Sequence, residues 1–143
     1  MISDAAIRAA LEAPLGASFA GLPVSRVGEG ADPRGPHIRT YLVRERRVEL
    51  YRGIRRARGM LGILVHAPVG DGIAAAEAVA DRIPRLYRPD DTTDGALPLG
   101  ARTIVIREVS VMSPYRGVDE ATAIERWLIV PVQIDWRLDI TAP

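Results

Sequence analysis

The chain has 143 residues, of which 48% are hydrophobic and 26% charged, and these values are ordinary for one soluble globular domain. There is no cysteine, which excludes disulfide scaffolds, thiol nucleophiles, Fe–S clusters and cysteine-based zinc sites. The formal net charge is +1, and all nineteen basic residues are arginine. Because arginine pairs with carboxylates and phosphates through a planar fork of donors, the chain is well supplied for polar contacts.

No apolar run approaches the ~18 residues that a membrane span needs. The first residues also lack the basic region and the apolar stretch of a signal peptide. We therefore expect no membrane contact.

The beginning of the chain predicts one helix followed by strands. Ser3 is the expected N-cap of a helix over residues 5–13, and Pro14 and Gly16 are expected to end it. Strands are predicted over residues 22–27 and 37–43, with a loop rich in glycine and proline between them.

Arginine is concentrated between residues 34 and 58. That stretch holds nine arginines against Glu45 and Glu49, a local net charge of +7. Two readings stay open, a phosphate-binding site and a solvated hairpin arm that reaches beyond the core over residues 44–58. The next strand, over residues 55–67, is expected to place one set of small and apolar residues on a common face: Ala57, Gly59, Leu61, Ile63 and Val65.

The most regular helical pattern lies over residues 73–83. Asp71 is its expected N-cap, and Pro84 is expected to end or kink it. Its apolar stripe, expected to face the strands, consists of Ile73, Ala76, Val79, Ala80 and Ile83.

The last third of the chain predicts two further strands. Residues 88–100 and 113–125 are expected to be connections. The strand over 102–112 changes parity, which predicts a bulge at Arg107–Glu108. The final strand, over 128–137, contains Pro131, which predicts an edge position or a local irregularity. The expected fold class is α+β: a single domain over residues 1–143, with a mixed, mostly antiparallel sheet, two main helices packed on it, long loops and a hairpin arm.

The sequence offers no constellation for catalysis. His37 and His66 have no metal-ligand spacing, and we interpret both as structural. No serine lies in a GxSxG turn, and the acidic residues Asp90, Asp91 and Asp94 do not have the spacing of a calcium loop. We therefore expect no enzyme activity, no metal and no cofactor.

Two longer motifs resemble a known family, the tail terminator (tail-completion) proteins of long-tailed bacteriophages and phage-like particles. The first is Ala67-Pro68-Val69-Gly70-Asp71-Gly72, which precedes the alanine-rich helix that closes on Ile83-Pro84-Arg85. The second is Val130-Pro131-Val132-Gln133-Ile134-Asp135-Trp136-Arg137 in the final strand. Both are turn and packing signals, and the resemblance extends from the first helix to the last strand.

The resemblance implies a structural protein of the virion tail or neck, assembled in the host cytoplasm. It implies a ring of six copies that caps the finished tail tube and contacts the major tail tube protein and the head connector. DNA would pass through the ring without sequence-specific binding. Two alternatives stay open, another neck or head–tail joining protein and a nucleic-acid-binding module that uses the arginine-rich hairpin.

Charge asymmetry suggests how copies could meet. Residues 71–94 carry a net charge of −3, opposite to the arginine-rich segment. A closed ring needs two different faces in contact, and opposite charges suit such an arrangement. The residues expected at a subunit or tube interface are Arg44, Arg46, Arg47, Arg52, Arg55, Arg56, Asp90, Asp91 and Asp94.

Overall fold

The computed structural model describes residues 2–29, 35–45, 48–51, 54–118 and 124–141. In these ranges the chain forms two α-helices, one short 3-10 helix and eight strands. In chain order they are α1 (Asp4–Ser18), β1 (Val24–Arg26), β2 (His37–Arg44), β3 (Val48–Tyr51), β4 (Ile54–Pro68), η1 (Val69–Asp71), α2 (Ala74–Tyr87), β5 (Gly95–Leu99), β6 (Arg102–Val111), β7 (Tyr115–Val118) and β8 (Glu125–Thr141).

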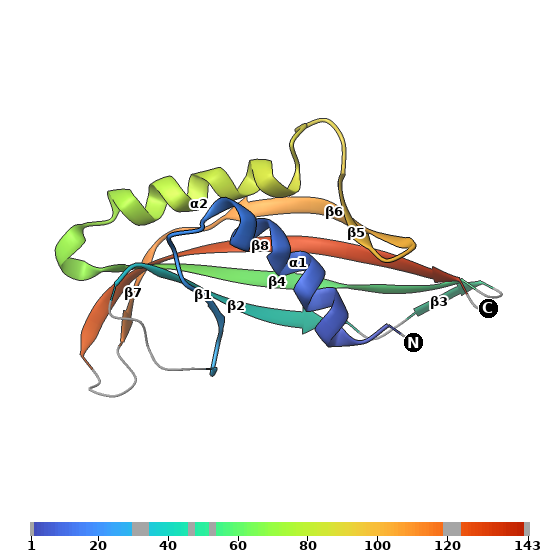
Figure 1. Ribbon diagram of the computed structural model, residues 1–143, viewed down its shortest axis with the longest axis horizontal. Coiled ribbons are helices and arrows are strands. Elements are labelled where there is room, and N and C mark those ends of the chain that lie inside the picture. The colour runs from blue at the N-terminus through green and yellow to red at the C-terminus, as the bar shows by residue number, and fades with distance from the viewer. Residues whose placement is uncertain (1, 30–34, 46–47, 52–53, 119–123, 142–143) are drawn as a thin grey trace.

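All eight strands belong to one sheet. Its main order is β1-β2-β4-β8-β6-β5, while β3 also pairs with β4 and β7 also pairs with β8. Every pairing is antiparallel except that of β1 with β2. Figure 1 shows both helices on the same side of the sheet. The predicted α+β class is confirmed, and we call the uncovered side of the sheet the helix-free face.

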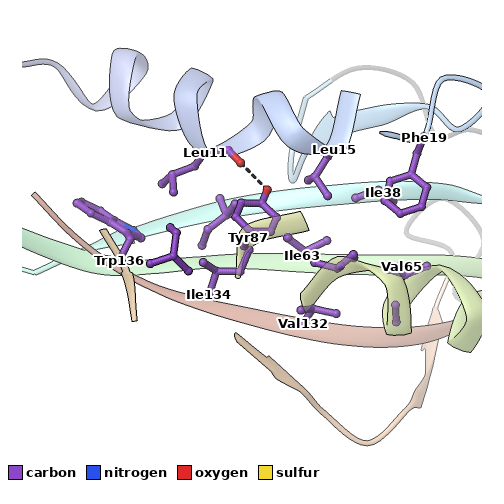
Figure 2. Close-up of a cluster of buried hydrophobic side chains, with 14 of the residues drawn as sticks. Leu11, Leu15, Phe19, Ile38, Ile63, Val65, Tyr87, Val132, Ile134 and Trp136 are labelled. Carbon is purple, nitrogen blue, oxygen red and sulfur yellow. Dashed lines mark hydrogen bonds between the residues drawn. The ribbon is translucent and has the colours of Figure 1, made fainter. Parts of the chain in front are cut away.

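The hydrophobic core lies between the helices and the sheet. Alternate residues of β4 and β8, such as Ile63, Val65, Val132 and Ile134, are fully buried and point toward the helices, as Figure 2 shows. The expected face of β4 is therefore confirmed. In α2 the expected stripe faces the core, with Ala76, Ala80 and Ile83 buried and Ile73 and Val79 half-buried against it.

Helix α1 begins as expected but is longer than expected. The Ser3 hydroxyl accepts a hydrogen bond from the Ala6 N–H at 3.2 Å, which confirms the N-cap. The predicted end at Pro14 is wrong, because the helix continues to Ser18. An interior proline costs about 3 kcal/mol, but burial of Leu15 beyond it contributes about 1.5–3 kcal/mol. Leu15 also accepts a closing hydrogen bond from the Phe19 N–H at 3.0 Å.

Helix α2 differs from expectation at both ends. Asp71 is not its N-cap, because this residue belongs to the 3-10 turn η1 and α2 begins at Ala74. Pro84 does not end the helix, which continues to Tyr87. Tyr87 is buried, and its hydroxyl donates a hydrogen bond to the Leu11 carbonyl in α1 (Figure 2). This anchored tyrosine offsets the hydrogen bond lost at the proline.

Two predicted connections contain strands. Residues 95–99 form β5 against β6, and residues 115–118 form β7 against β8. Gly95 is required where β5 begins, because a side chain there would collide with the Tyr87 carbonyl at 1.7 Å. Both strands are short and lack a clear alternation of apolar residues, so their pairing depends on the long neighbouring strand.

The expected irregularities are located in β6 and β8. The β6–β8 register shifts between Ile106 and Glu108, which confirms the predicted bulge. Pro131 is not on an edge strand, because β8 is central. Its carbonyl accepts from the Met112 N–H at 2.9 Å, just past the end of β6 and before β7 begins. The nitrogen of Pro131 faces the same neighbours as its carbonyl, β6 and β7. The absence of an N–H there therefore costs no hydrogen bond to β4.

Candidate interaction surface

Two tyrosines stand on the helix-free face. Tyr41 lies directly opposite Gly62, and its ring fills the space that a side chain at position 62 would need. Tyr41 is 39% exposed and Tyr115 is 47% exposed. Partial burial raises the pKa of the Tyr115 phenol, and the nearby Tyr41 adds to that effect. Sequence reasoning selected neither of these two exposed tyrosines as a site.

The arginine-rich segment lies in a long antiparallel hairpin. β2 pairs with β4 from His37↔His66 to Arg44↔Gly59, and β3 pairs with the beginning of β4. Figure 1 shows β3 at the end of the sheet near the C-terminus. Among the expected interface residues, Arg46, Arg47 and Arg52 lie outside the described residues. For Arg55 the structure describes only its place in β4.

Three arginines of this segment, Arg44, Arg56 and Arg58, have carboxylate partners within the chain. Arg44 forms an ion pair with Asp4 at the beginning of α1. Arg56 donates to Asp139 at 2.7 Å, directly across the β4–β8 pair, and Arg58 donates to Glu45 at 2.5 Å. The bond from Arg56 lowers the pKa of the Asp139 carboxyl. Pairing within the chain thus accounts for three of the nine arginines that the sequence places here.

A groove of about 500 Å³ lies beside these pairs. Of the expected interface residues, the basic Arg56 and the acidic Asp94 line it. The charged residues that line it are Glu45, Arg56, Arg58, Asp94, Arg107, Glu108, Asp135 and Arg137. Four are arginines and four are carboxylates, so the formal charges balance.

The acidic loop after α2 has a defined turn. Asp90 accepts hydrogen bonds from the backbone N–H and the hydroxyl of Thr92, at 2.9 and 2.7 Å, and these bonds lower the pKa of its carboxyl. Arg88 donates to the backbone carbonyls of Asp91 and Thr93. Asp90 and Asp91 are exposed, and neither lines the groove that Asp94 lines.

The two histidines lie together at the other end of the β2–β4 pair. Their rings stack with centroids 4.3 Å apart, and the centroids of the His37 and Trp127 rings lie 4.7 Å apart with the two planes nearly perpendicular. Each Nδ1 contacts a backbone carbonyl two residues back, at 2.9 Å for His37 and 3.0 Å for His66. Because a carbonyl only accepts, each Nδ1 carries the proton. Both side chains are buried, which fits the structural interpretation.

Neither a metal cluster nor a membrane span is found in the part of the chain that the structure describes. No group of three or more histidine or acidic side chains there could hold a metal ion. No described helix is long and apolar enough to cross a membrane.

Comparison with known proteins gives one family match. The model of a family described as "Phage tail terminator protein" matches residues 6–136. A search of curated proteins finds no match. Twelve chains of solved structures match, and one has 23% sequence identity and a TM-score of 0.68 over 96% of each chain. At that identity the similarity supports the fold alone.

Proposed function

Because the chain belongs to the phage tail terminator protein family, we propose that it forms a closed ring of six copies that caps the completed tail tube. The ring joins the tube to the head connector, and DNA passes through its channel without sequence-specific binding. The family match over residues 6–136 is the observation that carries this proposal. The same match supports a structural role in the phage particle rather than an enzymatic one.

The proposal extends to the whole chain. Residues 1–143 act as one tail-terminator domain, located in the tail or neck of the virion after assembly in the host cytoplasm. Its partners are further copies of itself, the major tail tube protein and a head-completion or connector protein. These partners follow from the position of a cap at the end of a tube.

Charged contacts between copies belong to this proposal. Asp91 lies in the defined turn after α2, where Arg88 fixes its backbone. Arg44 and Arg56 already have partners within the chain, so a neighbouring carboxylate would share or exchange those partners. Exposed pairs of this kind contribute about 0–1 kcal/mol each. Their role is to set register and encounter rate, while apolar contacts hold the ring together.

The nucleic-acid-binding alternative has less support. Tight binding to DNA requires arginines that neutralise several phosphates. Arg56 and Arg58 are instead paired with carboxylates of their own chain, and the adjacent groove has balanced charges. Such a surface lets DNA pass without holding it.

Removal of the gene from its phage, followed by complementation with variants, tests the proposal. Without the protein we expect tails of irregular length that fail to join heads, counted in negative-stain images. Charge reversal at Arg46, Arg47, Arg55 and Arg56 together should weaken capping, whereas Arg85→Glu on the exposed side of α2 serves as a control. Normal capping by the fourfold variant, with loss of DNA passage alone, would show that these arginines face DNA. Normal tails in the absence of the gene would refute the capping role.

A further inference from the structure

Strand β2 has an open edge along its second half. β1 covers β2 only from Ile38 to Thr40. The Thr40 carbonyl points to that side, because it accepts from the Val27 N–H at 2.9 Å. On the opposite side, the Glu45 N–H donates to the Arg58 carbonyl of β4 at 2.8 Å. These bonds establish which backbone groups of β2 point toward β4 and which point away.

Successive residues of a strand point their N–H and C=O groups to alternate sides. Leu42 and Arg44 therefore point away from β4, in the same direction as Thr40. Among the described strands, none pairs with β2 on that side beyond Thr40. The edge is flanked by exposed apolar side chains, because Tyr41 and Val43 are both exposed. An edge with these properties is a template for another strand.

The lateral edge of the sheet opposite β2 offers a matching strand. β7 pairs with β8, and no second described strand pairs with it. Tyr115 and Val118 of β7 are also exposed. Among the other edges, β5 contains Pro98 and β1 has only three residues. β3 pairs only with β4 and continues the edge of β2, while the part of β6 beyond Ile106 continues the edge of β7. The edges of β2 and β7 thus lie at the two opposite lateral edges of one sheet.

We propose that the β2 edge of one copy pairs with β7 of the next copy, so that the sheets of the ring join edge to edge. This inference rests on the proposed ring. A ring contact joins two different surfaces, and these edges are different surfaces along which no further described strand is paired. β2 and β7 run in opposite directions within the sheet, since β4 and β8 lie between them in antiparallel order. A rotation that keeps the strand direction from one copy to the next would therefore make the new pair antiparallel.

The register of the sheet adds a geometric consequence. Leu42 is level with Ile134 of β8 through Leu61, whereas Gly117 of β7 is level with Trp127. Ile134 and Trp127 are seven residues apart, which is about 23 Å along the strand, and the four strands are about 19 Å wide. With Leu42 paired to Gly117 of the next copy, closing a ring across this stagger tilts the strands by about 50° from the ring axis.

The absence of natural cysteine makes cross-linking a clean test. A chain with Val43→Cys and either Tyr115→Cys or Val118→Cys should form disulfides between copies on oxidation. The product should be a series of cross-linked oligomers up to the size of the complete ring. The control replaces Val43→Cys with Val27→Cys, because Val27 is equally exposed but lies outside the open segment. The amount of cross-linked oligomer should be at least tenfold lower for the control.

A second variant tests the same edge without a disulfide. Val43→Lys should raise the protein concentration needed for ring assembly at least tenfold and leave monomer stability unchanged, because a lysine protects an edge strand. Val27→Lys is its control. If rings form, yet neither cysteine pair cross-links and Val43→Lys assembles normally, edge joining is refuted and the ring proposal stands. If the wild-type chain forms no ring, alone or in particles, both proposals are refuted.

Discussion

Replacement of Tyr87 by phenylalanine removes one hydroxyl from the seam between α1 and α2. That hydroxyl is buried and donates to the Leu11 carbonyl. The carbonyl keeps its helical partner, the N–H four residues later, so the loss is that of one hydrogen bond rather than of a fully orphaned acceptor. We expect Tyr87→Phe to lower the free energy of unfolding by about 1 kcal/mol, which corresponds to a fall in Tm of about 3 °C.

The effect should depend on pH with a defined sign. Burial raises the pKa of the Tyr87 phenol, and the charge of Glu12 raises it further. A raised pKa in the folded state contributes stability that is complete below the unfolded pKa of about 10 and is lost as the pH rises above it. Above that pH the wild type should lose up to about 1.4 kcal/mol per pH unit relative to Tyr87→Phe. The two proteins should become equally stable near pH 11.

Urea unfolding at 25 °C between pH 8 and pH 11, followed by circular dichroism, measures the difference. Tyr41→Phe is the matched control, because Tyr41 is exposed on the helix-free face. Its effect on stability should be small at pH 8. A difference between wild type and Tyr87→Phe that stays constant across this pH range would show that the Tyr87 phenol is not held protonated in the core.

Three further changes test the packing and the charges. Gly95→Ala should destabilise the fold by more than about 1 kcal/mol in urea titrations, because the new methyl group would overlap a backbone carbonyl of α2, whereas Gly70→Ala has open space and should be neutral. Ala80→Leu should cost about 1–3 kcal/mol by overpacking the seam between α2 and the sheet, and Ala78→Leu on the exposed side should not; equal melting temperatures would refute the assigned face. Asp139→Asn removes a carboxylate whose pKa is lowered by an arginine across the strand pair, so the wild type should be the more stable protein above about pH 4 and the two should converge as the pH falls below that value. A difference that persists at pH 2 would contradict the ion pair.

The long strands could be predicted because their patterns are local. In β8 the alternate residues Val130, Val132, Ile134 and Trp136 are all buried, as their parity indicates. The β6 bulge could be predicted in the same way, since an apolar strand that changes parity keeps one face buried only if it carries an extra residue. Such features depend on neighbouring residues alone, and the sequence contains them directly.

The helix ends and the charged surface depended on distant residues. Pro14 and Pro84 are local signals to stop, but burial of residues beyond them extends both helices. The partner of Arg56 is Asp139, which is 83 residues away, and no spacing rule connects them. The count of arginines in the segment was therefore correct, while the pairing of Arg56 within the chain depends on the register of β4 and β8.

The pairing of β4 with β8 has a mechanical consequence. The ladder runs without a break through fifteen residue pairs, from Ile54↔Thr141 to Pro68↔Trp127, about 50 Å in length. Its hydrogen bonds lie perpendicular to the strands, so tension along the strands loads all of them at the same time. Tension applied across the strands would instead open them one after another. The protein should therefore be stiffest along the direction of β4 and β8, and a pull at either end of that axis would be transmitted to the other.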